Sequence, residues 1–178
     1  MNVKFEPMWI PDVILIKPEI FKDERGFFEE TYHIEKFREA GITTFVQDNH
    51  SRSKKGVLRG LHYQIQQPQG KLVRVTQGTI LDIAVDLRQT SSTFGKWVHV
   101  ILDGNDFHQL YIPPGFAHGF YTLSDSADIM YKCTTLYLPE AERILLWNDL
   151  GIDWQTTEPL LSDKDRHGSK LADAELFP

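Results

Sequence analysis

The sequence is poor in cysteine and has no long apolar run, and each absence excludes some classes of protein. Cys133 is the only cysteine among 178 residues, so neither an internal disulfide nor a metal site built from several cysteines is expected. No apolar stretch approaches the roughly 18 residues of a membrane span, and the first residues lack the apolar core of a secretory signal. We therefore expect a cytoplasmic protein without a membrane partner, in which Cys133 is a packing residue.

An excess of positive charge is also absent. The chain has 19 Lys and Arg against 25 Asp and Glu, a formal net charge of −6. Proteins that bind nucleic acid usually carry a basic face, so no nucleic-acid partner is expected. The net charge is still compatible with a local basic pocket for a phosphorylated small molecule. The length suits one domain of about 100–200 residues. Because no repeat or linker divides the chain, we predict a single domain over residues 1–178.

Short strand-like segments dominate the chain from residue 11 to residue 147. They recur about every 10–15 residues, and this spacing favours an all-β antiparallel sandwich or barrel. Residues 33–40 have helical spacing and end at Gly41, a common helix terminator. Residues 71–76 and 80–87 flank a glycine-containing turn and predict a β-hairpin. Residues 138–178 are rich in Pro, Asp and Glu, and we expect loops with short helices there.

The segment from Gly56 to Lys71 carries the most informative residues. It places Arg59, His62 and Lys71 on or beside one predicted hairpin. Strict strand alternation would direct Arg59 and His62 to opposite faces. Gly60 between them offers a place for a β-bulge that would direct both to one face.

Two short motifs resemble those of small cupin-type barrels, and one of them is altered. Residues 113–118 (Pro-Pro-Gly-Phe-Ala-His) match the second motif. In the first, Gly56 precedes His62 by the usual interval, but Gln64 replaces a histidine ligand and Lys71 replaces a glutamate ligand. A divalent transition metal needs several imidazole or carboxylate ligands. We therefore expect no metal, with the Lys71 charge taking over part of its electrostatic role.

Nearly the whole chain resembles the dTDP-4-dehydrorhamnose 3,5-epimerases, a cupin-type family of dTDP-L-rhamnose synthesis. Short matching segments follow one another in order at 21–28, 45–51, 57–62, 69–74, 93–95, 112–120, 131–134, 146–149 and 161–165. The resemblance implies a cupin-type antiparallel β-barrel or jelly roll with short C-terminal helices. It also implies a homodimer that uses no cofactor and takes a dTDP-sugar as substrate.

The family's reaction sets the roles that the resemblance implies. The substrate carries a ketone at C4, so a proton can leave C3 or C5 to give an enolate and return on the opposite face. His62 matches the base, Asp165 its paired carboxylate, Tyr131 the proton donor on the opposite face and Lys71 the group near the C4 oxygen. Other substrate contacts match Arg25, Glu30, Gln47, Asn49, Arg59, His118, Glu142 and Lys164.

Several alternatives stay open at this point. His118 could simply form a cavity wall, Asp163 is a rival to Asp165, and the acid near position 30 is either Glu29 or Glu30. The function could also be epimerisation at C3 or C5 alone, or ketoisomerisation on the same fold. More distant alternatives are a metal-dependent cupin, such as an oxygenase, and a non-catalytic module that binds sugar nucleotides.

Overall fold

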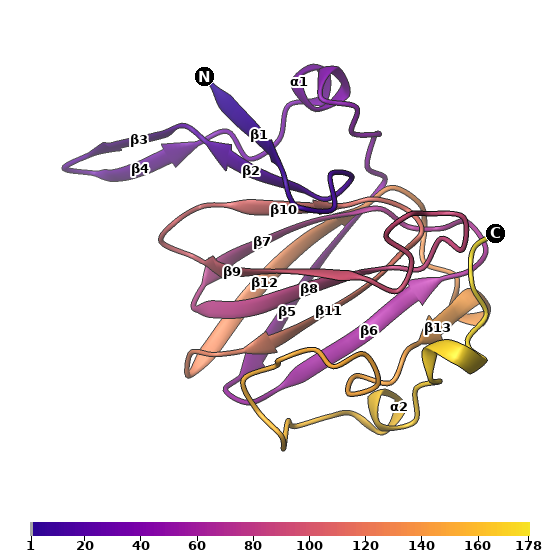
Figure 1. Ribbon diagram of the computed structural model, residues 1–178. Helices are drawn as coiled ribbons and strands as arrows, with labels where there is room; N and C mark the ends of the chain where they lie inside the picture. The colour runs from indigo at the N-terminus through magenta and orange to yellow at the C-terminus, as the bar shows by residue number, and fades with distance from the viewer. Residues whose placement is uncertain (1) are drawn as a thin grey trace.

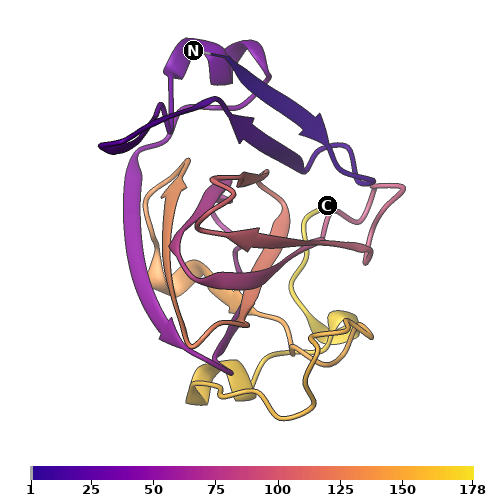
Figure 2. The same ribbon diagram turned by 90° about the vertical axis from the view of Figure 1, so that its left-hand side faces the viewer.

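Two facing antiparallel sheets form the body of the protein in this computed structural model, which describes residues 2–178. The six-stranded sheet has the order β1 (Val3–Pro7), β2 (Ile14–Pro18), β10 (Gln109–Ile112), β7 (Lys71–Gln77), β12 (Ser126–Cys133) and β5 (Gln47–Lys54). The five-stranded sheet has the order β13 (Glu142–Ile144), β6 (Leu58–Gln64), β11 (Phe116–Thr122), β8 (Thr79–Asp86) and β9 (Trp97–Asp103). Figure 2 shows the strands curving around a shared interior. The predicted all-β barrel architecture is confirmed.

The remaining elements are short and lie outside the two sheets. β3 (Ile20–Asp23) and β4 (Gly26–Glu29) form a separate hairpin, and α1 (Ile34–Glu39) ends just before Gly41, as predicted. The C-terminal region holds η1 (Pro139–Ala141), α2 (Asp163–Arg166) and η2 (Leu171–Asp173) between loops. Across residues 2–178, no helix has both the length and the apolar character needed to cross a membrane.

The apolar residues divide into an inner and an outer cluster. Between the sheets, Val73 and Ile129 of one sheet pack with Ala84 and Phe120 of the other. On the outer side of the five-stranded sheet, C-terminal residues including Trp154 cover the other face of β8. β8 is therefore buried on both faces, and the alternation of its side chains sends Leu81, Ile83 and Val85 outward and Asp82, Ala84 and Asp86 inward.

The predicted hairpin of residues 71–76 with 80–87 is wrong. β7 pairs with β10 and β12, whereas β8 pairs with β9 and β11. The turn at Gly78 instead carries the chain from one sheet to the other. Gly78 has a φ of +81°, and a Cβ there would lie 2.0 Å from the Ser126 carbonyl oxygen, so only glycine fits. β6 and β7 likewise belong to different sheets, so their side chains meet across the interior.

β6 contains the bulge for which Gly60 offered a place. His62 pairs with His118 and Arg59 with Phe120, so β6 has one more residue than β11 between these pairs. Gly60 has a φ of +127°, and a Cβ there would lie 2.5 Å from Gly119 Cα. The extra residue brings Arg59 and His62 to the same cavity.

Candidate active site

A cavity of about 620 Å³ lies between the two sheets. One wall comes from β5, β7 and β12, the other from β6, β11 and β13, and residues 160–165 close part of its rim. The predicted residues that line it are Gln47, Asn49, Arg59, His62, Lys71, His118, Tyr131, Glu142, Lys164 and Asp165.

His62 and Asp165 form a histidine–carboxylate pair at this cavity. His62 Nε2 lies 2.5 Å from Asp165 Oδ1, and the Ser162 hydroxyl donates to Asp165 Oδ2 at 2.6 Å. Ser162 is also the N-cap of α2, so the short helix that carries Asp165 is fixed at its start. Burial acts to raise the pKa of Asp165, but the hydrogen bonds from His62 and Ser162 outweigh burial and hold that pKa below its usual value. The carboxylate therefore stays charged and orients the imidazole.

Lys71 enters the cavity from the opposite sheet. Its ammonium group lies 3.5 Å from the His62 carbonyl oxygen, the only hydrogen-bond acceptor found for it among the described residues. Burial lowers the pKa of Lys71. A partly desolvated ammonium group without a fixed carboxylate partner is suited to stabilise negative charge that develops on a bound molecule.

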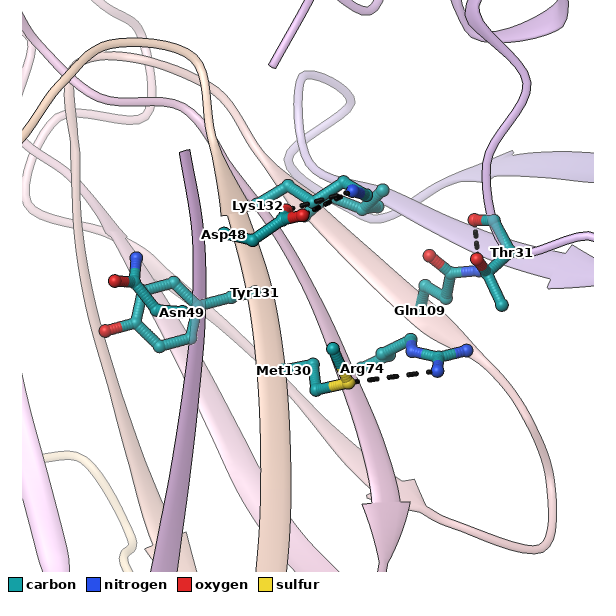
Figure 3. A pocket seen from close by; sticks show the side chains of 9 residues that line it. Thr31, Asp48, Asn49, Arg74, Gln109, Met130, Tyr131 and Lys132 are labelled. Carbon is teal, nitrogen blue, oxygen red and sulfur yellow. Dashed lines mark hydrogen bonds and ion pairs between the residues drawn. The ribbon is translucent and has the colours of Figure 1, made fainter. Parts of the chain in front are cut away.

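Tyr131 lies next to Asn49 on the same wall. The two residues are cross-strand partners on β12 and β5. Figure 3 shows their side chains on the opposite side of these strands from Asp48 and Lys132, which line a smaller pocket at the outer face. Burial raises the pKa of Tyr131, so its phenol keeps its proton at neutral pH. It can therefore serve as a proton donor toward the cavity.

His118 forms a second histidine–carboxylate pair in the cavity wall. Its Nε2 lies 2.9 and 3.0 Å from the two carboxylate oxygens of Asp82, a residue of β8 that is fully buried. His118 pairs directly with His62 across β11 and β6. Burial lowers the pKa of His118 and outweighs the neighbouring Asp82 carboxylate, which acts to raise that pKa. Asp82 was not among the predicted site residues; its position on the inward face of residues 80–87 was the signal that could have found it.

The other predicted contacts at the cavity are held by polar neighbours. Gln47 donates to Asn49 Oδ1 at 3.2 Å, and Arg59 Nε donates to the Ser53 hydroxyl at 2.9 Å. At the rim, Lys164 Nζ lies 2.9 Å from both carboxylate oxygens of Glu142. Asp163, the rival to Asp165, is exposed at the start of α2 and does not line the cavity.

Arg25 and Glu30 do not line the cavity of their own chain. Arg25 lies at the turn of the β3–β4 hairpin, which projects from the barrel in Figure 1. The Arg25 side chain is 85% exposed and bonds to Asp23. Glu30 follows β4 and pairs with Lys36, and the alternative Glu29 pairs with Arg74.

Gln64, at the position of a cupin metal ligand, has a structural task. Its amide nitrogen donates to the carbonyl oxygens of Gln67 and Leu136, and its oxygen accepts from the Leu138 backbone N–H. Gln64 therefore joins two loops at the end of β6. Within residues 2–178, no three His, Cys, Asp or Glu side chains are grouped closely enough to bind a metal ion.

Comparison with known proteins places this chain in a family. The sequence profile of the dTDP-4-dehydrorhamnose 3,5-epimerases matches residues 7–173. The chain belongs to this family. It is 56% identical to the dTDP-4-dehydrorhamnose 3,5-epimerase of Pseudomonas aeruginosa, over 95% of this chain and 96% of that protein. It is 53% identical to the enzyme of the same name from Shigella flexneri, over 94% and 96%.

A solved member of the epimerase family has nearly the same structure. The dTDP-6-deoxy-D-glucose-3,5-epimerase of Legionella pneumophila, in complex with dTDP-4-keto-L-rhamnose, superposes with a TM-score of 0.95 at 49% identity. The alignment covers 98% of this chain and 95% of that one. The epimerase fold is therefore present along almost the full length of the chain.

Proposed function

We propose that this protein converts dTDP-4-dehydro-6-deoxy-D-glucose to dTDP-4-dehydro-L-rhamnose by inverting C3 and C5, as a step of dTDP-L-rhamnose biosynthesis. The observation that carries this proposal is the meeting of the His62–Asp165 pair and Lys71 in one cavity, from opposite sheets. Family membership supplies the substrate class, and the cavity supplies groups suited to the chemistry.

In the proposed reaction His62 removes the proton from C3 and, in a second round, from C5. Between the two rounds His62 releases its proton to solvent and Tyr131 regains one from solvent. Each C–H bond is acidified by the C4 ketone, and loss of the proton places negative charge on the C4 oxygen. Asp165 holds the imidazole in one orientation and stabilises the imidazolium that forms. The buried ammonium group of Lys71 stabilises the enolate oxygen, an electrostatic effect that strengthens when the bound substrate excludes water from the site.

Tyr131 returns a proton on the face opposite His62. The two residues come from different sheets, β12 and β6, so they face the cavity from opposite walls. Proton removal on one face and delivery on the other inverts the carbon. In each proposed step a side chain of this chain acts as the base, the acid or the electrostatic partner.

The polar rim of the cavity is proposed to hold the nucleotide part of the substrate. Arg59 can bind a phosphate oxygen through its guanidinium group, with Gln47 and Asn49 on the facing strand as further donors. Glu142 and Lys164 lie at the rim, and His118 lies deeper in the wall. These assignments rest on position in the cavity and on the family motif.

Incubation with dTDP-4-keto-6-deoxyglucose in heavy water tests the proposed function. We expect deuterium at both C3 and C5 and an NMR spectrum of the doubly inverted product. Deuterium and inversion at one carbon alone would replace the proposal with a single-carbon epimerase. Binding of dTDP without any exchange would replace it with a non-catalytic binding module.

We further propose a cytoplasmic homodimer in which the β3–β4 hairpin of one subunit completes the cavity of the other. A hairpin that pairs only with itself is marginally stable, and this one exposes Phe27 and Phe28 at 59% and 60%. Packing against a second copy would bury these side chains. It would also bring Arg25 and Glu30, which lie away from their own cavity, to the cavity of the partner.

Subunit complementation tests this arrangement. Arg25→Ala and His62→Ala are each expected to be nearly inactive as pure dimers. If Arg25 acts across the interface, a heterodimer of the two variants contains one intact site and one doubly altered site. After equal mixing and subunit exchange, about half of the dimers are heterodimers, so activity should return to about one quarter of the wild-type value. No recovery, despite exchange verified by mass spectrometry, would show that Arg25 does not act in the partner's site.

A further inference from the structure

Asp82 is a buried carboxylate to which the mechanism above gives no role. It is 0% exposed, on the inward face of β8, and both of its oxygens lie within 3.0 Å of His118 Nε2. An ionised carboxylate only accepts hydrogen bonds. The proton of a neutral His118 is therefore held on Nε2, and Nδ1 is left bare.

The second ring nitrogen of His118, Nδ1, is available to the cavity. His118 lines the cavity, and no hydrogen-bond partner for its Nδ1 is found within residues 2–178. The titratable groups near the ring are Asp82, Lys71 and His62. Burial lowers the pKa of His118 and outweighs the opposing effect of the Asp82 carboxylate, so the ring is neutral at neutral pH. A bare nitrogen in such a ring accepts a hydrogen bond and donates none.

We propose that Asp82 is a positioning residue that fixes His118 as a hydrogen-bond acceptor for a hydroxyl group of the bound hexose. This inference rests on the proposed function, because it takes the cavity as the ketosugar site. It assigns the two histidine–carboxylate pairs different tasks. His62 transfers protons, whereas His118 fixes the orientation of the sugar ring relative to His62 and Lys71.

The position of His118 explains why orientation of the sugar would depend on it. His118 and His62 are direct cross-strand partners, and opposed side chains on paired strands lie about 5 Å apart at Cβ. A sugar hydroxyl bound by His118 is therefore separated by no more than the width of one hexose ring from the carbon that faces His62. Because a misplacement of about 1 Å can cost on the order of 100-fold in rate, a fixed tautomer at His118 matters for the reaction.

Nitrogen NMR of histidine-labelled wild-type protein tests the tautomer without any need for activity. We expect His118 to carry its proton on Nε2 and to have an unprotonated Nδ1 at pH 7. Addition of dTDP-glucose, which offers sugar hydroxyls, should shift the Nδ1 resonance, whereas dTDP alone should not. A proton on Nδ1, a doubly protonated ring, or equal shifts with both ligands would overturn the proposal.

Asp82→Asn tests the effect on catalysis, and Asp128→Asn is its matched control. Asp128 is also buried and also bonded to a histidine, His50, at 3.1 Å, but it lies away from the cavity. In Asp82→Asn we expect His118 no longer to be held in a single tautomer and kcat/KM to fall about 10- to 100-fold, because a misplacement of the sugar by up to about 1 Å has an effect of that order. Asp128→Asn should leave kcat/KM unchanged.

The outcomes separate this inference from the proposed function. If wild-type protein exchanges deuterium at C3 and C5 but folded Asp82→Asn keeps its kcat/KM, the positioning role is wrong and the epimerase assignment stands. If wild-type protein shows no exchange, the proposed function fails. If Asp82→Asn does not fold, the tautomer measured in the wild type still decides the inference.

Discussion

His62 and Asp165 are 103 residues apart in the sequence, yet His62 Nε2 lies 2.5 Å from Asp165 Oδ1. The imidazole comes from the middle of a sheet, and the carboxylate comes from a four-residue helix near the C-terminus. Asp165 is 2% exposed and takes a second hydrogen bond from Ser162. The C-terminal segment is therefore part of the site, because it supplies the carboxylate that orients the proposed base.

Replacement of either member of this pair should slow proton exchange, and loss of the base should slow it more. We expect His62→Ala to lower deuterium incorporation at C3 and C5 by about 100- to 10,000-fold, the usual contribution of a positioned base. Asp165→Asn should lower it by a smaller factor, because the base remains but loses its orientation. The control is Asp163→Asn on the same helix, which should exchange at the wild-type rate. Wild-type exchange in His62→Ala would show that another group is the base.

Tyr131→Phe should separate proton removal from inversion. The phenol keeps its proton because burial raises the pKa of Tyr131, so the substitution removes a donor and leaves the base intact. We expect deuterium still to enter C5 while the doubly inverted product is lost. Tyr111→Phe is a suitable control, because Tyr111 is also buried with a raised pKa but lies outside the cavity. Unchanged product formation in Tyr131→Phe would exclude Tyr131 as the proton donor.

The sequence predicted the strands better than it predicted their partners. The strand character of a segment depends on local sequence, so residues 80–87 could be predicted correctly as a strand. Which strands pair is decided by contacts between distant segments, and the predicted hairpin across Gly78 was wrong for this reason. The hairpin predicted over residues 56–71 was wrong for the same reason: β6 and β7 belong to different sheets, so Lys71 and His62 meet across the interior.

The site residues also divide into those that the sequence predicted and those that depend on contacts between distant segments. His62, Lys71, Tyr131 and Asp165 were expected from motif resemblance, and the fold brings all four to one cavity. Asp82 was missed because its inward-facing position alone does not identify its histidine partner, which depends on the pairing of β8 with β11. The expected placement of Arg25 beside the same cavity is not met within one chain, since the hairpin that carries it projects outward.

Lys71 should lower stability while it serves catalysis. Burial lowers the pKa of Lys71, so the unfolded chain holds this proton more tightly than the folded chain does. The resulting cost to the free energy of unfolding is present at neutral pH and fades as pH rises toward the ordinary lysine pKa of about 10.4. We expect Lys71→Met to lose about 100- to 1,000-fold in kcat and to be at least as stable as wild type in urea at pH 7. Its advantage should shrink toward pH 10; a variant less stable than wild type at pH 7 would contradict this account.

Asp86 should stabilise the turn between β8 and β9. Its carboxylate accepts hydrogen bonds from Arg88, Ser91 and Thr93, and the Arg88 guanidinium lies 4.7 Å from the centre of the Phe116 ring. Burial acts to raise the pKa of Asp86, but these hydrogen bonds outweigh burial and lower that pKa to about 2.

Asp86→Asn should therefore reduce stability in a pH-dependent way. Because folding lowers this pKa, the contribution is present at neutral pH, where it amounts to roughly 2 kcal/mol, and is lost as pH falls from about 4 to about 2. We expect the difference in the free energy of unfolding between wild type and Asp86→Asn to follow that course in urea titrations. Asp12→Asn is the control, since Asp12 bonds the same guanidinium from a half-exposed position and should change stability by less than about 1 kcal/mol. A loss in Asp86→Asn that stayed constant down to pH 2 would assign its effect to packing and not to charge.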